Sequence, residues 1–336
     1  MTIDRNQILH LELFQGLEGE DLSIALAAFR SFAVGAGEIL LEEGEPDRSM
    51  LVVVEGELAV SLGGVELARV GQGEVVGEMA LFGTFDRRSA TVRTLVGPTR
   101  LLIMDEEALR YLRVQDNPMA RTVEIVALQT VATRLRDLDF LIAQTAEGQE
   151  ELPRPDRGIM GRLAAAFGVG NRPSGAPPQP LEVLMATSGF AGRDPQILAR
   201  IAAHLVVVMA GKNEAILQEG TLGDDAFIIA EGKVAVFCKT ASGKVQRVAV
   251  LGPGHIFGHV SPTDAKVRTA TCTAQEPVYL LRIPGAVFRQ YLVETSAEGR
   301  TFRRGIIDAL SSQLRLANEH LVAMVMRHGG GAEGQR

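Results

Sequence analysis

The sequence lacks features that define several large classes of protein. Its only cysteines are Cys238 and Cys272, too few for a disulfide framework and without partners for a zinc site. No apolar run approaches the roughly 20 residues of a membrane helix, since the longest, 205–210, is strand-sized. Residues 1–10 contain charges and no apolar signal-peptide core. We therefore expect a cytoplasmic protein with no membrane span, in which both cysteines are buried free thiols.

The sequence also has no surplus of basic residues. It carries 34 Lys and Arg against 41 Asp and Glu, a formal net charge of −7. Proteins that bind nucleic acids usually need a basic surplus to replace counterions, so we expect no nucleic-acid partner. A hydrophobic fraction of 46% with 22% charged residues is typical of a globular protein and excludes disorder. The length of 336 residues predicts about two domains.

The chain contains an internal repeat, because it aligns with itself at an offset of 176 residues. The matching positions are Phe14 with Phe190, Glu43-Gly44 with Glu219-Gly220, and Glu55-Gly56 with Glu231-Gly232. The offset then rises to 181, where Gly73 and Gly77 match Gly254 and Gly258. The second copy therefore contains five additional residues, which we place within 238–247. Thr240 to Lys244 has the composition of a longer hairpin turn.

Each copy is rich in β-strand signals at its centre. Short apolar segments at 50–54, 58–62, 227–230 and 234–237 alternate with glycine-containing turns. This pattern predicts a sandwich or jelly-roll barrel. Helices are expected before the barrels at 20–32 and 196–205. The predicted fold class is mainly β with flanking helices, comprising two β-roll (jelly-roll) barrels, each followed by a long helix.

The two long helices carry apolar residues at alternating spacings of three and four. In the first helix these are Leu128, Val131, Leu135, Leu138 and Ile142, and in the second Ile307, Leu310, Leu314, Ala317, Leu321 and Met324. This spacing is that of a coiled-coil seam, which favours a homodimer. A helix packed on its own barrel explains the same spacing, and both interpretations stay open.

A linker separates the two copies. Residues 153–180 contain six of the fourteen prolines, which is typical of a connecting segment. Within it, 157–168 has the spacing of a short amphipathic helix that docks on its own protein, on a partner or on a membrane surface. We expect a first domain at 1–150, a linker at 151–180, a second domain at 181–328 and a disordered tail at 329–336.

Residues 73–92 carry the groups with recognisable chemistry. Gly77 opens a short helical turn whose backbone N–H groups form an anion nest. Glu78 offers a carboxylate to a ribose hydroxyl, Arg88 a planar fork for two phosphate oxygens, and Ser89 a further hydroxyl. Together they predict a site for a phosphorylated nucleoside. The alternative is an ordinary Glu78–Arg88 ion pair in a barrel without a ligand.

This segment resembles the phosphate-binding cassette of the cyclic nucleotide-binding domain family, and the resemblance covers most of 11–145. It implies that Glu78 binds the ribose 2′-hydroxyl and Arg88 the cyclic phosphate. The N–H groups around Met79 and Leu81, and of Ser89 and Ala90, would complete the phosphate cage. The site residues implied for the first barrel are Gly77, Glu78, Met79, Ala80, Arg88, Ser89 and Ala90. In this family, serine after the arginine accompanies cAMP, so Ser89 favours cAMP.

The second copy keeps the frame of the cassette but changes one key group. Its corresponding residues are Gly258, His259, Val260, Ser261, Arg268, Thr269 and Ala270. His259 stands where the first copy has Glu78, and a neutral histidine lacks the charge of a carboxylate. We therefore expect a second site that is weakened, altered or empty. Thr269, by the same family resemblance, makes cGMP conceivable there, and the base-capping residue is expected within 134–140.

The arrangement of the whole chain narrows the function. The first long helix resembles the dimer helix of bacterial cAMP receptor-type transcription factors, but no helix-turn-helix follows it. Tandem copies resemble the regulatory subunit of protein kinase A. The six histidines show no metal spacing, so we expect no catalytic and no metal site.

We therefore expect a non-enzymatic cyclic-nucleotide receptor, most simply for cAMP, that signals through its helices to an unknown protein effector. A ligand-free interaction scaffold and a kinase-regulatory-subunit-like inhibitor are the alternatives.

Overall fold

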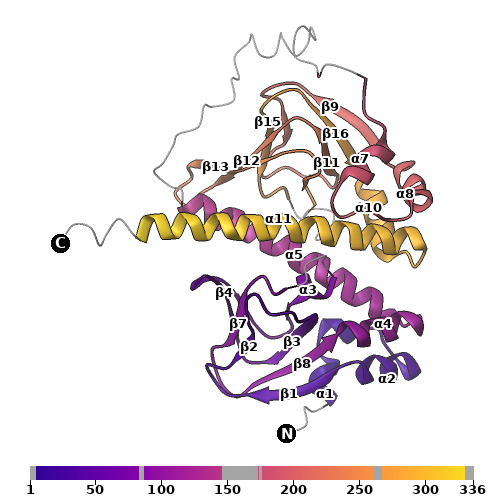
Figure 1. Ribbon diagram of the computed structural model, residues 1–336, viewed down its shortest axis with the longest axis vertical. Helices are drawn as coiled ribbons and strands as arrows, with labels where there is room; N and C mark the ends of the chain where they lie inside the picture. Colours follow the sequence, from indigo (N-terminus) through magenta and orange to yellow (C-terminus); the bar gives the residue numbers. More distant parts are fainter. Residues whose placement is uncertain (1–4, 83–86, 146–172, 174–175, 260–266, 330–336) are drawn as a thin grey trace, which may run out of the picture. The chain divides into compact units, whose positions relative to one another are not determined.

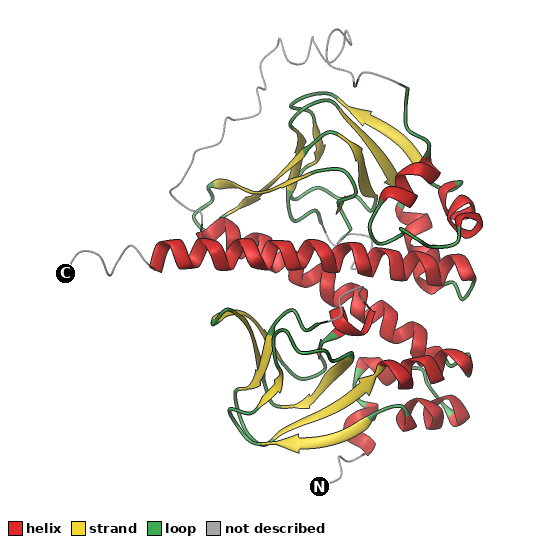
Figure 2. Ribbon diagram, in the orientation of Figure 1, coloured by secondary structure: helices red, strands yellow, loops and turns green. Residues whose placement is uncertain are grey.

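The computed structural model describes residues 5–82, 87–145, 173, 176–259 and 267–329. The chain divides into two compact units, one formed by 1–131 with 314–336 and the other by 132–313. Each unit contains one β-barrel of the repeat, drawn with its element labels in Figure 1 and by secondary structure in Figure 2. The two barrels are treated separately below.

The first barrel is preceded by short helical segments and followed by longer helices. The helical elements are α1 (Arg5–Leu9), η1 (Glu12–Phe14), α2 (Gly19–Ala27), α3 (Glu78–Phe82), α4 (Glu106–Val114) and α5 (Pro118–Thr145). The strands are β1 (Arg30–Val34), β2 (Ile39–Leu41), β3 (Ser49–Glu55), β4 (Leu58–Leu62), β5 (Val65–Val70), β6 (Val75–Val76), β7 (Thr91–Thr94) and β8 (Thr99–Asp105).

The helix expected at 20–32 is too long at its C-terminal end. Helix α2 ends at Ala27, and Arg30 already begins strand β1. Phe32 and Val34 are two positions apart and pack against the barrel core, as alternate residues of a strand do. Pairing of β1 with β8 satisfies the backbone groups of this segment, so tertiary pairing overrides the helical pattern.

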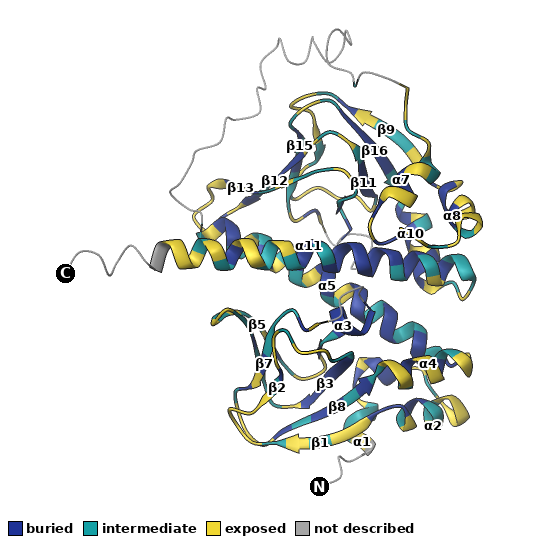
Figure 3. Cartoon of the chain, viewed as in Figure 1, coloured by how far each residue is buried: buried dark blue, intermediate teal, exposed yellow. Residues whose placement is uncertain are grey.

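The strands of the first barrel form two four-stranded antiparallel sheets, with orders β1-β8-β3-β6 and β2-β7-β4-β5. One apolar cluster contains residues from both sheets: Leu51, Val53, Val76 and Leu101 from the first, and Leu41, Leu58, Val60, Val70 and Val92 from the second. Strand β3 is buried along all but its last residue (Figure 3). The two sheets therefore share one core, as in the β-roll that the sequence predicts.

The second barrel repeats this topology. Its strands are β9 (Val206–Ala210), β10 (Ala215–Leu217), β11 (Ala226–Glu231), β12 (Val234–Lys239), β13 (Val245–Leu251), β14 (Ile256–Phe257), β15 (Thr271–Ala274) and β16 (Val278–Ile283). The sheet orders are β14-β11-β16-β9 and β10-β15-β12-β13. Its helices are α7 (Pro180–Ala186), α8 (Pro195–Ala202), α10 (Gly285–Val293) and α11 (Ala297–Gly329).

Strand register agrees with the offsets of the repeat. In the first barrel Leu51 pairs with Val76. The sequence offsets of 176 and 181 move this pair onto Phe227 and Phe257, which pair in the second barrel. The inserted residues fall in the hairpin that the sequence indicated, since the β12–β13 turn runs from Thr240 to Lys244 and is closed by a 2.8 Å bond from Thr240 N to Lys244 O.

Both long helices form where they were predicted, as α5 and α11. The five apolar residues of the first predicted seam, from Leu128 to Ile142, are all buried within the single chain. Of the second seam, Ile307, Leu310, Leu314 and Leu321 are also buried. The homodimer stays a prediction.

Several expectations concern parts of the chain outside the described residues. These are most of the linker, the segment 157–168, Val260, Ser261 and nearly all of the expected tail.

Both cysteines are buried and free, as predicted. They lie on the adjacent strands β12 and β15. Within the described ranges, no helix is long and apolar enough to cross a membrane. Those ranges also hold no group of three or more potential metal ligands.

Candidate functional site

The first site begins at the glycine between β6 and α3. Gly77 has φ +88°, a left-handed conformation that favours glycine. A Cβ atom here would lie 2.6 Å from the carbonyl oxygen of Ser49 and 2.8 Å from a terminal nitrogen of Arg88. The carbonyl of Gly77 accepts bonds from Ala80 N at 3.2 Å and Leu81 N at 3.3 Å, which close the first turn of α3. Only glycine lets the chain turn into α3 this close to the arginine.

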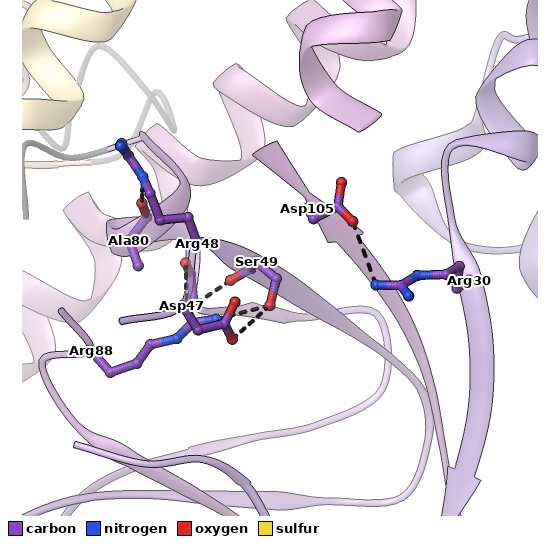
Figure 4. Close-up of polar contacts among 8 residues, drawn as sticks. Arg30, Asp47, Arg48, Ser49, Ala80, Arg88 and Asp105 are labelled. Atoms are coloured by element: carbon purple, nitrogen blue, oxygen red, sulfur yellow. Dashed lines mark hydrogen bonds and ion pairs between the residues drawn. The ribbon is translucent and has the colours of Figure 1, made fainter. Parts of the chain in front are cut away.

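Arg88 is buried and lies against the loop between β2 and β3 (Figure 4). Its Nη1 donates to Ser49 O at 2.7 Å and to Gly77 O at 3.4 Å. Its Nη2 donates to Ser49 Oγ at 2.9 Å and forms an ion pair with the Asp47 carboxylate. Asp47 also accepts a 3.0 Å bond from Ser49 Oγ. The guanidinium is therefore held in position by contacts with the protein itself.

One donor of this arginine has no acceptor among the residues that the structure describes. A guanidinium carries five N–H donors, and four of them have the acceptors just named. The fifth, on Nε, is buried and finds no acceptor among the residues that the structure describes. A buried N–H without a partner is costly, so it indicates a position where an additional acceptor would be stabilising.

The main chain around Arg88 is fixed by the same loop. Gly44 N donates to Arg88 O at 3.0 Å, and Arg88 N donates to Glu45 O at 2.9 Å. Arg48 Nε donates to Ala80 O at 3.2 Å, which connects the loop to α3. The loop between β2 and β3 thus positions both halves of the cassette.

The other predicted residues of the first site are close together. Glu78, Met79 and Ala80 are buried on α3. Ser89 and Ala90 are half-buried just before β7, and Ser89 Oγ lies 3.8 Å from Met79 Sδ. The expected alternative of a Glu78–Arg88 ion pair is wrong, because the carboxylate that pairs with Arg88 is that of Asp47. Glu78 is fully buried on the adjoining helix α3.

The second barrel keeps the same frame. Gly258 has φ +74°, and a Cβ atom there would lie 3.0 Å from both Asp225 O and Arg268 Nη1. Arg268 is buried and donates to Gly258 O at 2.7 Å and to Asp225 O at 2.6 Å. Gly220 N donates to Arg268 O at 2.8 Å, as Gly44 N does to Arg88 O. The predicted correspondence of the two arginines is confirmed in their backbone surroundings.

The histidine of the second cassette is buried beside that arginine. His259 is 6% exposed. Burial, and then the positive charge of Arg268, lower its pKa to about 4. The imidazole is therefore neutral at pH 7, as the sequence argument assumed. Thr269 is exposed and Ala270 half-buried next to Arg268.

Sequence reasoning missed Asp47 and the rest of the β2–β3 loop. The repeat contained a usable signal, because the offset of 176 residues places Gly223 opposite Asp47. An aspartate in one copy corresponds to a glycine in the other, and the same offset places Asp224 and Asp225 opposite Arg48 and Ser49, so the two loops carry different charges. That signal becomes interpretable only once the loop is seen to contact the arginine.

The fold and the paired cassettes define a class of ligand-binding β-roll protein. The family model described as "Cyclic nucleotide-binding domain" matches residues 32–116 and 207–295, which together make up more than half of the chain. The chain belongs to the cyclic nucleotide-binding domain family and contains two of its domains in tandem.

Known proteins resemble the chain in part. A "CRP-like cAMP-activated global transcriptional regulator" of Mycobacterium tuberculosis is 24% identical over 144 residues, 43% of this chain and 62% of the relative. The "cGMP-dependent protein kinase, isozyme 1" of Drosophila melanogaster is 22% identical over 275 residues, 81% of this chain and 28% of the relative. The chain therefore spans less than two thirds of the length of either.

A solved structure is also similar. The regulatory domain of Toxoplasma gondii PKA, crystallised with cAMP, aligns with a TM-score of 0.31 and 20% identity. The alignment covers 86% of this chain and 93% of that one.

Proposed function

We propose that this protein is a cyclic-nucleotide receptor without catalytic activity, and that its first barrel binds cAMP. Glu78 accepts the ribose 2′-hydroxyl, and Arg88 binds the cyclic phosphate. The backbone N–H groups of Met79, Ala80, Ser89 and Ala90 surround the phosphate. The observation that carries the proposal is the buried Nε of Arg88, a donor without an acceptor among the described residues.

The charges around Arg88 support a ligand with one negative charge. The guanidinium is already paired with Asp47, and the buried Glu78 places a second carboxylate on α3. A cyclic phosphodiester brings a single charge, together with a ribose hydroxyl that can donate to a carboxylate. Hydrogen bonds to charged groups contribute about 1.5–3 kcal/mol each, so both contacts matter for affinity.

The choice of cAMP depends on Ser89 and on the named activity of a relative. Family resemblance associates serine after the arginine with cAMP, and the Mycobacterium relative is described as cAMP-activated. A single hydroxyl contributes a preference of about 1–3 kcal/mol over cGMP. Calorimetry with both nucleotides measures this preference directly.

Ligand binding is transmitted through contacts of Arg48. Its Nε donates to Ala80 O on α3 and lies 3.5 Å from Glu106 Oε2 at the start of α4. Movement of α3 on binding therefore reaches α4, which precedes the long helix α5 in the chain. We propose that this movement is passed to a protein effector.

The boundaries 1–150, 151–180 and 181–328 remain our proposal for the domains.

Calorimetric titration with cAMP and cGMP tests the proposal on four chains. These are the wild type, Arg88→Ala, Glu78→Gln and the neighbouring control Arg87→Ala. Arg87 is exposed and donates to Gly44 O at 2.7 Å, so its removal deletes a guanidinium next to the site but outside the cage. We expect Arg88→Ala to abolish measurable binding, Glu78→Gln to weaken it about 10- to 100-fold, and Arg87→Ala to leave it within about twofold.

Two results contradict the proposal. The absence of binding heat with either nucleotide on the wild type would favour the alternative, an interaction scaffold with ligand-free barrels. Unchanged binding by Arg88→Ala, with circular dichroism confirming a folded chain, would move the site away from the first cassette.

A further inference from the structure

One arginine connects the end of the cassette helix α3 to both α4 and α5. Arg113, in the last turn of α4, has its Cζ atom 6.0 Å from the ring centroid of Phe82, which is the last residue of α3. Its Nη2 donates to Glu124 Oε1 on α5 at 2.9 Å. A guanidinium can pack its planar face on an aromatic ring while its edge binds a carboxylate. Phe82, Arg113 and Glu124 are called the Arg113 relay below.

The α5 end of the Arg113 relay is almost completely buried. The side chain of Glu124 is 2% exposed and that of Arg113 27%, and Phe82 is also buried. Separating a buried carboxylate from its cation is strongly destabilising, because the remaining charge is left without compensation. Arg113 and Glu124 therefore move together. A displacement of Phe82 that carries Arg113 with it also displaces α5.

The first turn of α5 is held by a separate contact. Asn117 Oδ1 accepts a 3.0 Å bond from Met119 N, and Asn117 Nδ2 donates to Asp21 O on α2 at 2.9 Å. Glu124 lies between one and two turns further along the helix. A force applied at Glu124 therefore acts on α5 beyond a fixed end, which favours a change in its direction.

The second copy joins its helices through different groups. An offset of 179 residues superimposes the apolar seams of the two long helices. It places Leu292 at the position of Arg113 and Arg303 at that of Glu124. Arg303 is buried, and its Nη1 donates to three backbone carbonyls at the end of α10 at 2.7–3.2 Å. Leucine cannot form an ion pair, so the residues of the relay are particular to the first copy.

We propose that Arg113 is a positioning residue of the first site, which holds α3 in the conformation that binds the ligand and carries the response to α5. This inference rests on the proposed binding of cAMP to the first barrel. Glu78 lies about one helical turn before Phe82 on α3, so the ligand and the Arg113 relay act on the same short helix. Ligand binding and the relay therefore stabilise each other, because coupling between two sites is reciprocal.

Hydrogen–deuterium exchange of the full chain, with and without cAMP, tests the transmission, and calorimetry measures the affinity of the same chains. In the wild type we expect cAMP to slow amide exchange in α3 and in residues 119–131 of α5. The main variant is Arg113→Leu/Glu124→Met, because a buried ion pair is often replaced by apolar side chains without loss of stability. We expect this variant to bind cAMP about three- to tenfold more weakly, and cAMP no longer to slow exchange in 119–131.

Two further variants separate the parts of the relay. Phe82→Leu removes the ring and keeps the ion pair, and we expect it to lose the response of α5 while remaining folded. Arg113→Lys keeps the charge but not the planar face, so we expect an intermediate response. The control is Arg110→Ala, about one turn earlier on α4, where the arginine side chain is 72% exposed and lies 3.7 Å from Glu107. We expect the control to retain the wild-type affinity and the wild-type response.

Two results would overturn the inference. One is a wild-type response of 119–131 in Phe82→Leu or in Arg113→Leu/Glu124→Met, with circular dichroism confirming a folded chain; Phe82→Leu decides the test if the double variant does not fold. The other is a wild type that binds cAMP with no change of exchange in 119–131. A wild type that does not bind cAMP would instead contradict the proposed function and this inference with it, so the two failures are distinguishable.

Discussion

Asp47 and Arg88 form an ion pair in the first barrel, with the arginine side chain 3% and the aspartate side chain 44% exposed. Both residues contact Ser49 as well. The pair joins the β2–β3 loop to the segment before β7, 41 positions further along the chain. The second barrel has Gly223 at the position of Asp47, and Arg268 donates to the backbone carbonyls of Gly258 and Asp225, so the two copies share a frame and differ in the partners of their arginines.

Removing the charge of Asp47 should increase the affinity of the first site for an anion. Asp47→Asn keeps a hydrogen-bond acceptor near Arg88 but removes the negative charge that opposes a phosphate. We expect cAMP affinity to rise about three- to tenfold at low salt, and the gain to shrink as salt screens the charge. The partly exposed ion pair contributes about 1 kcal/mol or less to stability, so the variant should fold.

The control for this variant is Asp105→Asn. Asp105 pairs with Arg30 at 3.5 Å (Figure 4), its side chain is 44% exposed and caps α4 through a 2.9 Å bond from Ala108 N, and the structure describes no side-chain contact between Asp105 and the cassette. We expect no change in cAMP affinity. A decrease in affinity for Asp47→Asn would show instead that the ion pair chiefly orients Arg88.

The two cassette glycines should differ in their tolerance of alanine. Both have positive φ, but a Cβ atom at Gly77 would lie 2.6 Å from a backbone oxygen, whereas the shortest contacts at Gly258 are 3.0 Å. We expect Gly77→Ala to destabilise its barrel by about 2–3 kcal/mol or more, and Gly258→Ala by about 1–2 kcal/mol. Urea-induced unfolding measures both. The reverse order would contradict the tighter backbone approach at Gly77.

His259 should make stability fall in mild acid. Its pKa is lowered to about 4 in the folded chain, against about 6.5 in the unfolded chain. The unfolded state therefore binds the proton first, so stability is complete above pH 6.5 and is lost as the pH falls toward 4. The loss is at most about 3 kcal/mol.

Unfolding measured between pH 4 and 7.5 checks this titration. We expect His259→Gln to flatten the pH dependence relative to the wild type. His320→Gln, at an exposed position on α11, should preserve the wild-type dependence. Parallel curves for the wild type and His259→Gln would exclude a buried, neutral His259.

The thiols should be inert in the folded chain. Burial raises the pKa of Cys272 to about 12 and also raises the pKa of Cys238, and only the thiolate is reactive. We expect DTNB to modify neither cysteine at pH 8 and to modify both in urea. Rapid modification of the native chain would mean that the β12–β15 region opens readily.

Sequence patterns were sufficient for the repeat and the β-roll fold. The reason is that strand alternation, glycine turns and the order Gly77, Glu78 and Arg88 are all local along the chain. The same kind of reasoning failed for 20–32, where pairing with β8 determines that Arg30–Val34 is a strand. The periodicity of the apolar residues correctly predicted the two long helices. It did not show which of these residues are buried.

By itself, then, the sequence determined that two copies of one nucleotide-binding frame exist and that one carries histidine where the other carries glutamate. Only the tertiary structure decided which charges meet. Asp47 and Arg88 are distant in sequence and become partners because the β2–β3 loop folds over the cassette. In the second copy the same loop brings Gly223 to Arg268. The sequence alone could not show that these positions lie beside the arginines, because charges interact through space and not along the chain.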